Sequence, residues 1–274
     1  MTPGLYIVAT PIGNLEDITH RAVRILKEAS VIACEDTRQT RKLLTHFGID
    51  TPMVSYHEHN EAQRTPELIE RLEAGATIAL VSDAGTPLVS DPGYRLVEVA
   101  TSRGIPVVPI PGVSAALTAL AAAGLPTDQF RFCGFLPPKS GQRRKALEKL
   151  KGEDATLIFY EAPHRILATL EDIAEVFGPD RPTVVARELT KLHEEFLRGT
   201  AREVHDKLAA RDAIKGEITL LVGKGQPGVA HSDLSIAEAV AQLESQGIDR
   251  MDAMKRIARE RGLSKREVYK ELNS

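Results

Sequence analysis

The sequence has no tryptophan, 4% aromatic residues and two cysteines among 274 residues. Two isolated cysteines cannot form a zinc–cysteine cluster. Cys34 and Cys133 each lie in an apolar, strand-like run, which predicts buried free thiols of a reducing compartment. Neither a disulfide framework nor a structural zinc site is therefore expected to stabilise this fold.

Long hydrophobic runs are also absent. The longest apolar stretch, residues 113–125, is interrupted by Ser114, Thr118 and Gly124 and is too short to span a bilayer. Residues 1–4 show no basic segment ahead of an apolar run, which argues against a signal peptide. These features predict a cytoplasmic protein with no membrane partner.

Excess positive charge is missing as well, because 35 Lys and Arg face 38 Asp and Glu, a net charge of −3. Any binding to nucleic acid must therefore use local basic patches. With 42% hydrophobic and 27% charged residues, the composition is that of a globular protein. The length suggests two domains and a small additional module.

Short β-branched runs alternate with amphipathic helical stretches in the first half of the chain, which predicts an α/β fold with parallel strands and helical crossovers. The expected strands are residues 5–9, 31–34, 53–56, 77–81 and 105–110. The expected helices are residues 17–29, 38–47, 94–103 and 114–123. A further, polar helix is expected to follow the third strand and to end at residue 72.

A turn at residues 124–127 separates this half from a less regular one. Strands at residues 156–160, 183–187, 195–200 and 217–222, with a helix at 202–211, predict a mixed sheet. Residues 223–228 read as a linker. We therefore expect α/β domains at residues 1–124 and 125–228, followed by a helical module at 229–274.

The last segment has three helical stretches and no strand pattern. Ser235 with Glu238, and Ser264 with Glu267, have the spacing of capping boxes, and Asp249 with Asp252 is a weaker version. A short turn at residues 261–264 joins the last two helices, as in a helix-turn-helix. From residue 249 onward, eight basic and five acidic residues give this tail a charge of +3.

Three loop segments follow expected strands, where open α/β sheets bind ligands. They are residues 9–14 (Ala-Thr-Pro-Ile-Gly-Asn), residues 81–93 (Val-Ser-Asp-Ala-Gly-Thr-Pro-Leu-Val-Ser-Asp-Pro-Gly) and residues 111–115 (Pro-Gly-Val-Ser-Ala). None contains a complete G-x-G-x-x-G or a Walker motif. Ser114 lacks a nucleophile elbow, so helix capping or ligand binding is the better interpretation.

Together these segments resemble the tetrapyrrole-methylase-like, class III S-adenosylmethionine-dependent methyltransferases. Gly85-Thr86-Pro87 stands where the family usually has Gly-Asp-Pro, and residues 111–115 look like its Pro-Gly-x-Ser motif. Pro11 and Asn14 replace residues that tetrapyrrole enzymes tend to have as Gly and Asp. With Thr86 in place of Asp, these departures argue against a tetrapyrrole substrate.

Further segments are similar to the members of this family that methylate small-subunit ribosomal RNA. They are residues 10–19, 34–38 (Cys-Glu-Asp-Thr-Arg), 55–60 (Ser-Tyr-His-Glu-His-Asn), 82–93, 159–165 (Phe-Tyr-Glu-Ala-Pro-His-Arg) and 187–194 (Arg-Glu-Leu-Thr-Lys-Leu-His-Glu). The resemblance implies S-adenosylmethionine bound between two α/β domains. It also implies a homodimer, and transfer to the ribose 2′-oxygen of a cytidine in 16S ribosomal RNA of the small subunit.

The resemblance places the cofactor against loops of small residues in the first domain. The second domain supplies further candidate contacts, which are weaker predictions. The expected cofactor residues are Pro11, Asp83, Ala84, Gly85, Ser90, Ser114, Ala115, Tyr160, Glu188, Gly216 and Glu217. No metal is expected, because the sulfonium is already activated. His57 and His59 share a strand-like spacing that suits metal ligands, but two ligands do not make a site.

A ribose hydroxyl must lose its proton to accept a methyl group, so a general base is needed. The candidates are Glu35, Asp36, His57 and His59. Histidine titrates nearest to neutral pH. We expect Asp36 and His57 to be the catalytic residues, with polar loop residues of no catalytic role as the alternative.

RNA contacts require cations near the site and on the tail. The expected ones are Arg38, Lys139, Arg143, Arg144, Lys145, Lys265 and Arg266. The run that begins at Lys139 is equally compatible with a solvated helix start.

Two other functions fit parts of the sequence. One is a class III methyltransferase that acts on a tetrapyrrole or a protein. The other is a nucleic-acid-binding regulator that responds to S-adenosylmethionine, whose support is the helix-turn-helix-like tail alone.

Overall fold

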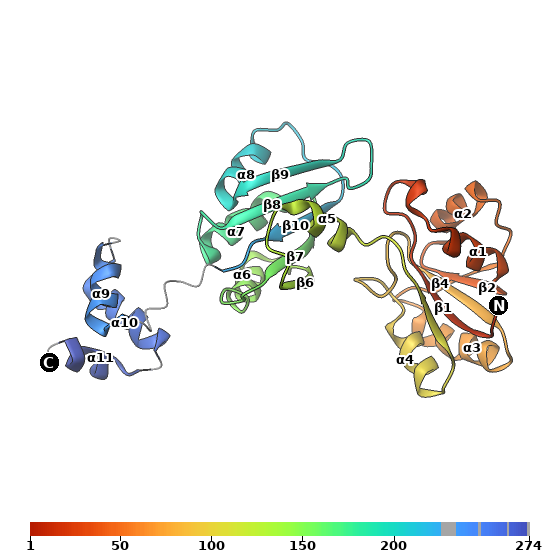
Figure 1. Cartoon of the computed structure of the whole chain (residues 1–274), viewed down its shortest axis with the longest axis horizontal. Helices are drawn as coiled ribbons and strands as arrows, with labels where there is room; N and C mark the ends of the chain where they lie inside the picture. The colour runs from red at the N-terminus through yellow and green to blue at the C-terminus, as the bar shows by residue number, and fades with distance from the viewer. Residues whose placement is uncertain (226–233, 246–247, 262, 273–274) are drawn as a thin grey trace. The chain divides into compact units, whose positions relative to one another are not determined.

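A computed structural model of the chain describes residues 1–225, 234–245, 248–261 and 263–272, and leaves the side chains of residues 256, 259, 260, 265 and 266 undescribed. The chain forms two compact units, Met1–Lys224 and Gly225–Ser274 (Figure 1). Within the described residues, none of the helices combines the length and the apolar character needed to cross a membrane.

The first sheet of the larger unit is entirely parallel, with strand order β3-β2-β4-β1-β5. Its strands are β1 (Gly4–Val8), β2 (Val31–Cys34), β3 (Met53–Ser55), β4 (Thr77–Val81) and β5 (Val107–Ile110). Strands β2 and β4 are buried along their whole length, which explains their uninterrupted apolar sequences. The order of strands and the parallel pairing confirm the predicted α/β fold.

Helices cover both faces of this sheet (Figure 1). Side chains of α1 (His20–Glu28) and α2 (Thr37–His46) join the core on one face. Those of α3 (Glu61–Glu73) and α4 (Tyr94–Ser102) join the core on the other. A short 3-10 helix, η1 (Leu15–Asp17), precedes α1. This layering leaves the loops at the carboxyl ends of the strands free to build a site.

The second sheet is mixed, as predicted, with strand order β6-β7-β10-β8-β9. Only β6 and β7 pair in parallel. Its strands are β6 (Phe130–Phe135), β7 (Thr156–Glu161), β8 (Pro182–Arg187), β9 (Glu195–Thr200) and β10 (Ile218–Val222). Helices α6 (Ser140–Glu148), α7 (Ile166–Phe177) and α8 (Ala201–Ala209) pack on one face of this sheet.

The opposite face of the second sheet is covered by α5 (Ala115–Ala123), which the sequence placed in the first domain. Ala116, Ala119 and Ala123 join a core with apolar residues of β7, β8 and β10. Small side chains allow the helix to lie close to the sheet. By its packing α5 belongs with the second sheet, and the domain boundaries of the chain stay a prediction.

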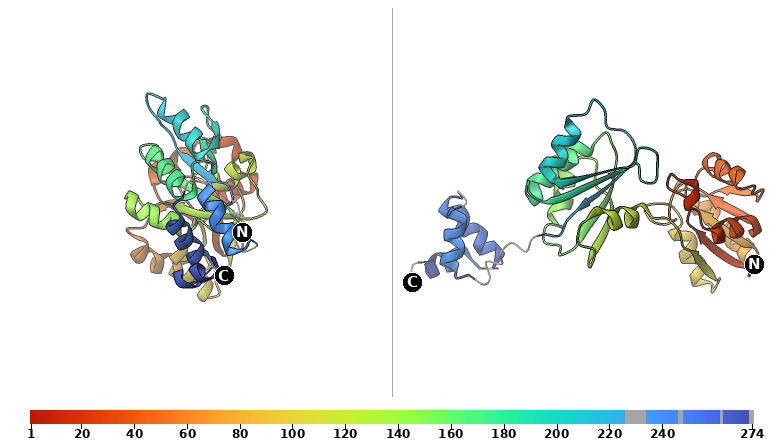
Figure 2. Two further views of the ribbon diagram at one scale, coloured as in Figure 1. Left: turned by 90° about the vertical axis from the view of Figure 1, so that its left-hand side faces the viewer. Right: turned by 45° about the horizontal axis from the view of Figure 1, so that its top comes forward.

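In its described residues, the smaller unit contains three helices, α9 (Ile236–Ser245), α10 (Arg250–Glu260) and α11 (Lys265–Leu272), which share a core of their own (Figure 2). Both predicted capping boxes form. The Glu238 carboxylate accepts from the Ser235 backbone N–H at 2.8 Å, and the Glu267 carboxylate accepts from the Ser264 backbone N–H at 2.6 Å. These caps fix the starts of α9 and α11.

Candidate functional site

A pocket with a volume of about 370 Å³ opens where the loops after β1, β4 and β5 meet the ends of β7 and β10. Ligand pockets of this size are typical of small-molecule sites. The structure brings eight of the eleven expected cofactor residues to its wall: Ala84, Gly85, Ser90, Ser114, Ala115, Tyr160, Gly216 and Glu217.

The other three expected cofactor residues lie just outside the wall. Pro11 precedes Ile12, which lines the pocket. The Asp83 carboxylate accepts a hydrogen bond from the Asp36 backbone N–H at 3.0 Å, away from the pocket. Glu188 lies behind the wall and accepts from the Glu217 backbone N–H at 2.9 Å. Glu188 therefore supports the wall and does not form part of it.

Hydrogen bonds join the three loops to one another. Thr10 and Gly85 exchange two backbone hydrogen bonds, of 2.8 and 2.9 Å. The Thr86 hydroxyl donates to the Val113 carbonyl at 2.9 Å and so connects the second loop to the third. An ionised aspartate at position 86 could only accept hydrogen bonds, so it could not make this contact. The departure from the family's Gly-Asp-Pro therefore has a structural role.

Backbone strain occurs in the second of these loops and in the loop between β8 and β9. Among the described residues, four non-glycine residues have positive φ: Leu88, Ser90, Glu188 and Thr190. The first two lie in the loop after β4, and the other two in the loop between β8 and β9. Such conformations cost energy and persist where the surrounding structure enforces them, which is common at ligand sites.

A second pocket adjoins the first and shares Ser90 and Asp91 with it. We call it the acidic pocket, because carboxylates make up most of its charged wall: Glu35, Glu58, Glu61, Asp91 and Glu98, with Arg95. The segments 34–38, 55–60 and 82–93, distant in sequence, meet around it. They are three of the six segments that carry the resemblance to enzymes acting on ribosomal RNA.

Of the two residues that line both pockets, Asp91 carries the titratable group, and the sequence analysis did not single it out. Burial, and then the nearby charges of Glu35 and Asp83, raise the pKa of Asp91 to about 6, although a hydrogen bond from Ser82 opposes this shift. Burial also raises the pKa of Glu35. A carboxyl group that titrates near neutral pH is suited to general acid–base chemistry.

The two predicted catalytic residues line neither pocket. The Asp36 carboxylate caps α2 and binds Arg38 through its backbone N–H and its guanidinium at 2.8 Å. These bonds to Arg38 lower the pKa of Asp36 to about 2, so this carboxylate is a weak base. The His57 Nε2 contacts the Asn60 side chain at 3.2 Å, while its Nδ1 is buried without a partner. The structure thus argues against Asp36 as the catalytic base.

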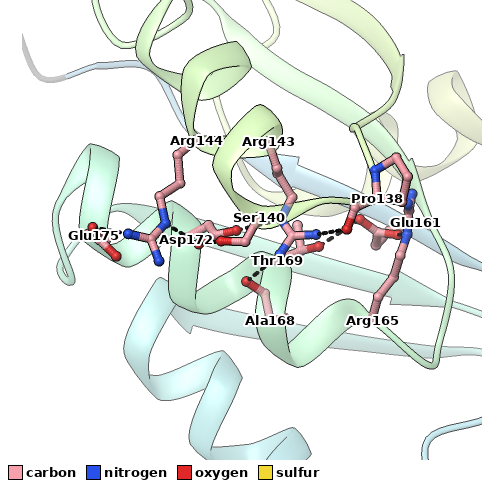
Figure 3. A network of polar contacts seen from close by, with 10 residues as sticks. All are labelled: Pro138, Ser140, Arg143, Arg144, Glu161, Arg165, Ala168, Thr169, Asp172 and Glu175. Carbon is pink, nitrogen blue, oxygen red and sulfur yellow. Dashed lines mark hydrogen bonds and ion pairs between the residues drawn. The ribbon is translucent and has the colours of Figure 1, made fainter.

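One predicted RNA contact is corrected by the structure. The side chain of Arg143 is 2% exposed and donates to Asp172 at 2.6 Å and to the carbonyls of Pro138 and Ala168 at 3.2 and 3.3 Å (Figure 3). It joins α6 to α7 and is not available to phosphate. Arg144 also binds Asp172 and reaches Glu175, at the surface.

The remaining predicted RNA contacts are accessible where they are described. The Arg38 side chain is 87% exposed, and Lys139 and Lys145 are exposed at α6. The side chains of Lys265 and Arg266 lie outside the described residues. In the part of the chain that is described, no group of three or more His, Cys, Asp or Glu side chains is arranged to hold a metal ion.

Comparison with known proteins identifies the family. Residues 4–205 match the family Tetrapyrrole (Corrin/Porphyrin) Methylases. Ribosomal RNA small subunit methyltransferase I of Halalkalibacterium halodurans is 54% identical over 272 residues, which cover 97% of this chain and 93% of that protein. The chain belongs to this methylase family. The protein of the same name from Bacillus subtilis is 49% identical to this methyltransferase, over 97% of the chain and 92% of that protein.

Solved structures share the fold of this methyltransferase. Uroporphyrin-III C-methyltransferase from Thermus thermophilus, complexed with S-adenyl homocysteine, aligns with a TM-score of 0.56 and 20% identity over 80% of this chain and 96% of that one. Diphthine synthase aligns with a TM-score of 0.61 and 16% identity over 80% of this chain and 89% of that one. The two-sheet architecture is therefore that of the family.

The methyl donor of this methyltransferase is S-adenosylmethionine, and the larger unit suits it. The 370 Å³ pocket is lined by small residues, including Ala84, Gly85 and Ala115, which allow a ligand to approach the backbone closely. The carboxyl group of Asp91 faces the same space and complements a sulfonium charge. When bound, the cofactor supplies an electrophilic methyl group, and the surrounding residues orient it.

Gly216→Ala is expected to weaken S-adenosylhomocysteine binding at least tenfold. Gly216 has a φ of +90°, and a Cβ there would lie 2.4–2.6 Å from the Glu188 side chain, which is itself fixed by Lys191 and Glu217. The wall would have to move. Calorimetric titration measures the effect, with Gly141→Ala as the control because a Cβ there meets nothing within 4 Å. Equal affinities for both variants would contradict this role.

Proposed function

We propose that this methyltransferase transfers the methyl group to the ribose 2′-oxygen of a cytidine in 16S ribosomal RNA of the small subunit. The observation that carries the proposal is the convergence of segments 34–38, 55–60 and 82–93 on the acidic pocket, next to the cofactor pocket. The names of relatives about half identical in sequence, Ribosomal RNA small subunit methyltransferase I, support the substrate class.

The acceptor oxygen is placed at Asp91 in this proposal. Methyl transfer is an in-line displacement, so the oxygen, the methyl carbon and the sulfur must align. As the oxygen attacks the methyl carbon and the carbon–sulfur bond breaks, the hydroxyl proton passes to the Asp91 carboxylate. Because the pKa of Asp91 is about 6, most of this carboxyl group is ionised at neutral pH and ready to accept a proton.

The charge of the acidic pocket restricts which part of the RNA enters it. Glu35, Glu58 and Glu61 would repel a phosphate, whereas carboxylates accept hydrogen bonds from ribose hydroxyls and from the amino group of cytosine. The phosphates then lie outside, toward exposed cations such as Arg38 and Lys139. The proposal therefore assigns sugar and base to the pocket and phosphate to its surroundings.

The test is transfer of radiolabelled methyl from S-adenosylmethionine to purified small ribosomal subunits that lack the modification, followed by nuclease mapping. A label that protects one phosphodiester bond against alkaline cleavage lies on a ribose 2′-oxygen, as the proposal requires. Porphyrinogen serves as the control acceptor. Transfer to porphyrinogen but not to subunits or free 16S RNA would reject ribosomal RNA as the substrate. The assignment of the chain as a methyltransferase would still hold.

Deleting residues from Ser232 onward is expected to weaken binding to 16S RNA roughly tenfold at low salt and to leave S-adenosylhomocysteine affinity unchanged. The deleted helices include a tail of charge +3 from residue 249, and every residue of the cofactor pocket lies within Met1–Lys224. Filter binding at several salt concentrations measures the change. Unchanged RNA affinity would show that the helical module does not contribute to substrate binding.

The family resemblance also leads us to propose that the methyltransferase acts as a homodimer in the cytoplasm. Strand β6 forms an edge of the second sheet, with Phe130 and Arg131 exposed, and could take part in such an association. Light scattering after gel filtration is expected to give twice the 29.9 kDa of one chain. A mass of one chain at micromolar concentration would count against the dimer.

A further inference from the structure

Phe135 is an exposed aromatic residue in the wall of the cofactor pocket, and the reaction proposed above assigns no role to it. The chain has seven phenylalanines, five tyrosines and no tryptophan, so aromatic side chains are scarce. Phe135 is 57% exposed. Single apolar residues on a protein surface are common, but a ring in the wall of a pocket is typical of ligand sites.

A β-bulge determines the face of the sheet on which Phe135 lies. Phe132 pairs with Ile158 and Phe135 pairs with Tyr160, so β6 advances three residues while β7 advances two. In a regular strand, side chains three positions apart point to opposite faces of the sheet. Here the rings of Phe132 and Phe135 both contact the Tyr160 ring, with centroids 4.9 and 5.7 Å away. The extra residue therefore brings Phe135 to the face that carries the pocket.

Gly134 allows this bulge and fixes its position. Its φ of +64° lies in the left-handed region, which glycine adopts without strain. A Cβ at Gly134 would lie 3.5 Å from the hydroxyl oxygen of Ser90, so the bulge lies against the loop after β4. Ser90 and Asp91 line both the cofactor pocket and the acidic pocket. The backbone next to Phe135 is thus held at the end of the cofactor pocket where the two pockets meet.

Tyr160 connects Phe135 to Asp91. Burial, and then the charge of Asp91, raise the pKa of Tyr160, although two hydrogen bonds oppose this shift, so the Tyr160 hydroxyl lies near Asp91. The Tyr160 ring in turn contacts Phe135 edge-on, at 63°. In the proposed reaction the acceptor oxygen meets the methyl group at Asp91. Phe135 therefore lies on the side of the cofactor pocket where the acceptor nucleotide enters.

The residues at this junction divide the recognition of a nucleotide between its polar edge and its flat face. Carboxylates of the acidic pocket accept hydrogen bonds from hydroxyl and amino groups, and they offer no flat apolar surface. Phe135 offers such a surface, and proteins that bind unpaired RNA commonly stack its bases on aromatic side chains. A nucleotide that enters a pocket leaves the stack of its own strand, and a new stacking partner offsets that loss.

We propose that Phe135 stacks on the base of the nucleotide that is methylated. This inference rests on the proposed RNA substrate and extends it, because it assigns the face of the base to Phe135 and its polar edge to the acidic pocket. The stack stabilises the nucleotide outside its own strand and holds its ribose beside Asp91. An aromatic ring at position 135 is therefore required for efficient transfer, whereas binding of the cofactor does not depend on it.

The first experiment compares Phe135→Leu, which keeps an apolar side chain without the ring, with Phe135→Tyr, which keeps the ring. Single-turnover transfer to small subunits that lack the modification is measured over a range of subunit concentrations, at saturating cofactor. The maximal rate divided by the half-saturating concentration is expected to fall roughly tenfold in Phe135→Leu and to stay within about twofold of the wild type in Phe135→Tyr. The affinity for S-adenosylhomocysteine is expected to be unchanged in both variants.

Phe130→Leu is the matched control, since Phe130 lies on the same strand, is 46% exposed and lines neither pocket. It is expected to transfer methyl groups like the wild type, and light scattering checks that its mass is also that of the wild type. A Phe135→Leu variant that transfers as efficiently as the wild type would overturn the proposal. A loss of S-adenosylhomocysteine affinity as large as the loss of transfer would also overturn it, because the ring would then contact the cofactor.

A tryptophan at position 135 reports the stack independently of catalysis. Because the sequence contains no tryptophan, Phe135→Trp and Phe130→Trp each carry a single indole, whose emission a stacked base quenches. Free 16S RNA is added with S-adenosylhomocysteine at saturation, at a concentration where filter binding shows that the RNA is bound. Quenching is expected in Phe135→Trp and not in Phe130→Trp. Equal changes in both variants, or no change in either, would overturn the proposal, and this holds even if Phe135→Leu fails to fold.

The two proposals fail separately. If the wild type methylates small subunits and Phe135→Leu does so equally well, the stack is rejected and the proposed function stands. If RNA quenches Phe135→Trp but the wild type transfers no methyl group to ribosomal RNA, the proposed function is rejected and the contact between Phe135 and a base stands.

Discussion

Asp91→Asn is expected to lower the rate of methyl transfer to ribosomal RNA by about 10²–10⁴-fold, the usual contribution of a general base. The variant keeps the shape of the side chain and removes the group that accepts the proton. Asp91 lies where the cofactor pocket meets the acidic pocket, so its carboxylate is the one placed next to both reactants. Single-turnover assays at saturating cofactor measure the chemical step directly.

The pH dependence gives an independent signature. A base must be ionised, and the pKa of Asp91 is raised to about 6, so the wild-type rate is expected to rise through pH 6 and then level off. The Asn variant should lack this rise.

Stability is expected to change in the opposite direction from activity. A carboxyl group whose pKa is higher in the folded state than its usual 3.8 destabilises the fold once the pH exceeds both values. Asp91→Asn should therefore melt at the same temperature as the wild type or higher at pH 7.5. A variant that is stable, binds S-adenosylhomocysteine and retains the wild-type rate would exclude Asp91 as the base. Asp36→Asn is the control, and its rate should change little.

Arg143→Met is expected to lower the free energy of unfolding by about 3–5 kcal/mol, the typical effect of removing one partner of a buried ion pair. The guanidinium lies inside the fold, and its loss leaves the Asp172 carboxylate, 4% exposed, without its 2.6 Å contact and two carbonyls without a donor. Ser140 and Arg144 still contact Asp172, which places the expected loss near the lower end. Urea denaturation measures it.

Arg144→Met is the matched control for this prediction. Arg144 is the next residue, binds the same carboxylate and is 45% exposed, so its removal should destabilise the fold much less than the removal of Arg143. If both variants lose a similar free energy of unfolding, the burial of Arg143 does not determine how much it stabilises the fold. Figure 3 also shows Glu161, a wall residue of the cofactor pocket, which is bound to Thr169 and Arg165 and not to Arg143 or Asp172. Arg143→Met is therefore expected to leave S-adenosylhomocysteine affinity unchanged.

Much of the fold follows from sequence patterns, because strand–helix alternation and buried apolar strands have clear periodicities. The loops that form the cofactor pocket were also predictable, since ligand loops follow parallel strands. The prediction that Arg143 contacts RNA was wrong because it was based on the charge of the residue and not on its position in the helix. Arg143 lies four residues before Leu147, which is buried, and this helical spacing marks the inner face of α6.

Asp91 shows what the sequence could not provide. Its neighbours Ser90 and Pro92 indicate a turn, and nothing local reveals that its carboxyl group is buried beside Glu35 and Asp83. The pKa of Asp91 depends on tertiary contacts with β2 and its loop, which meet the loop after β4 only in the folded sheet. The assignment of α5 likewise depended on packing, because an apolar helix at a domain junction has no sequence feature that selects its sheet.

The hydrogen bonds among the three loops have a consequence for how such enzymes diverge. Thr10 is tied to Gly85, and Thr86 to the Val113 carbonyl, so a change in one loop alters the conformation that the others require. Substitutions in these loops are therefore expected to be non-additive. An Asp taken alone from the tetrapyrrole enzymes into position 86 would arrive without the partners that suit it. A functional change in one of these loops is therefore expected to need compensating changes in the other two.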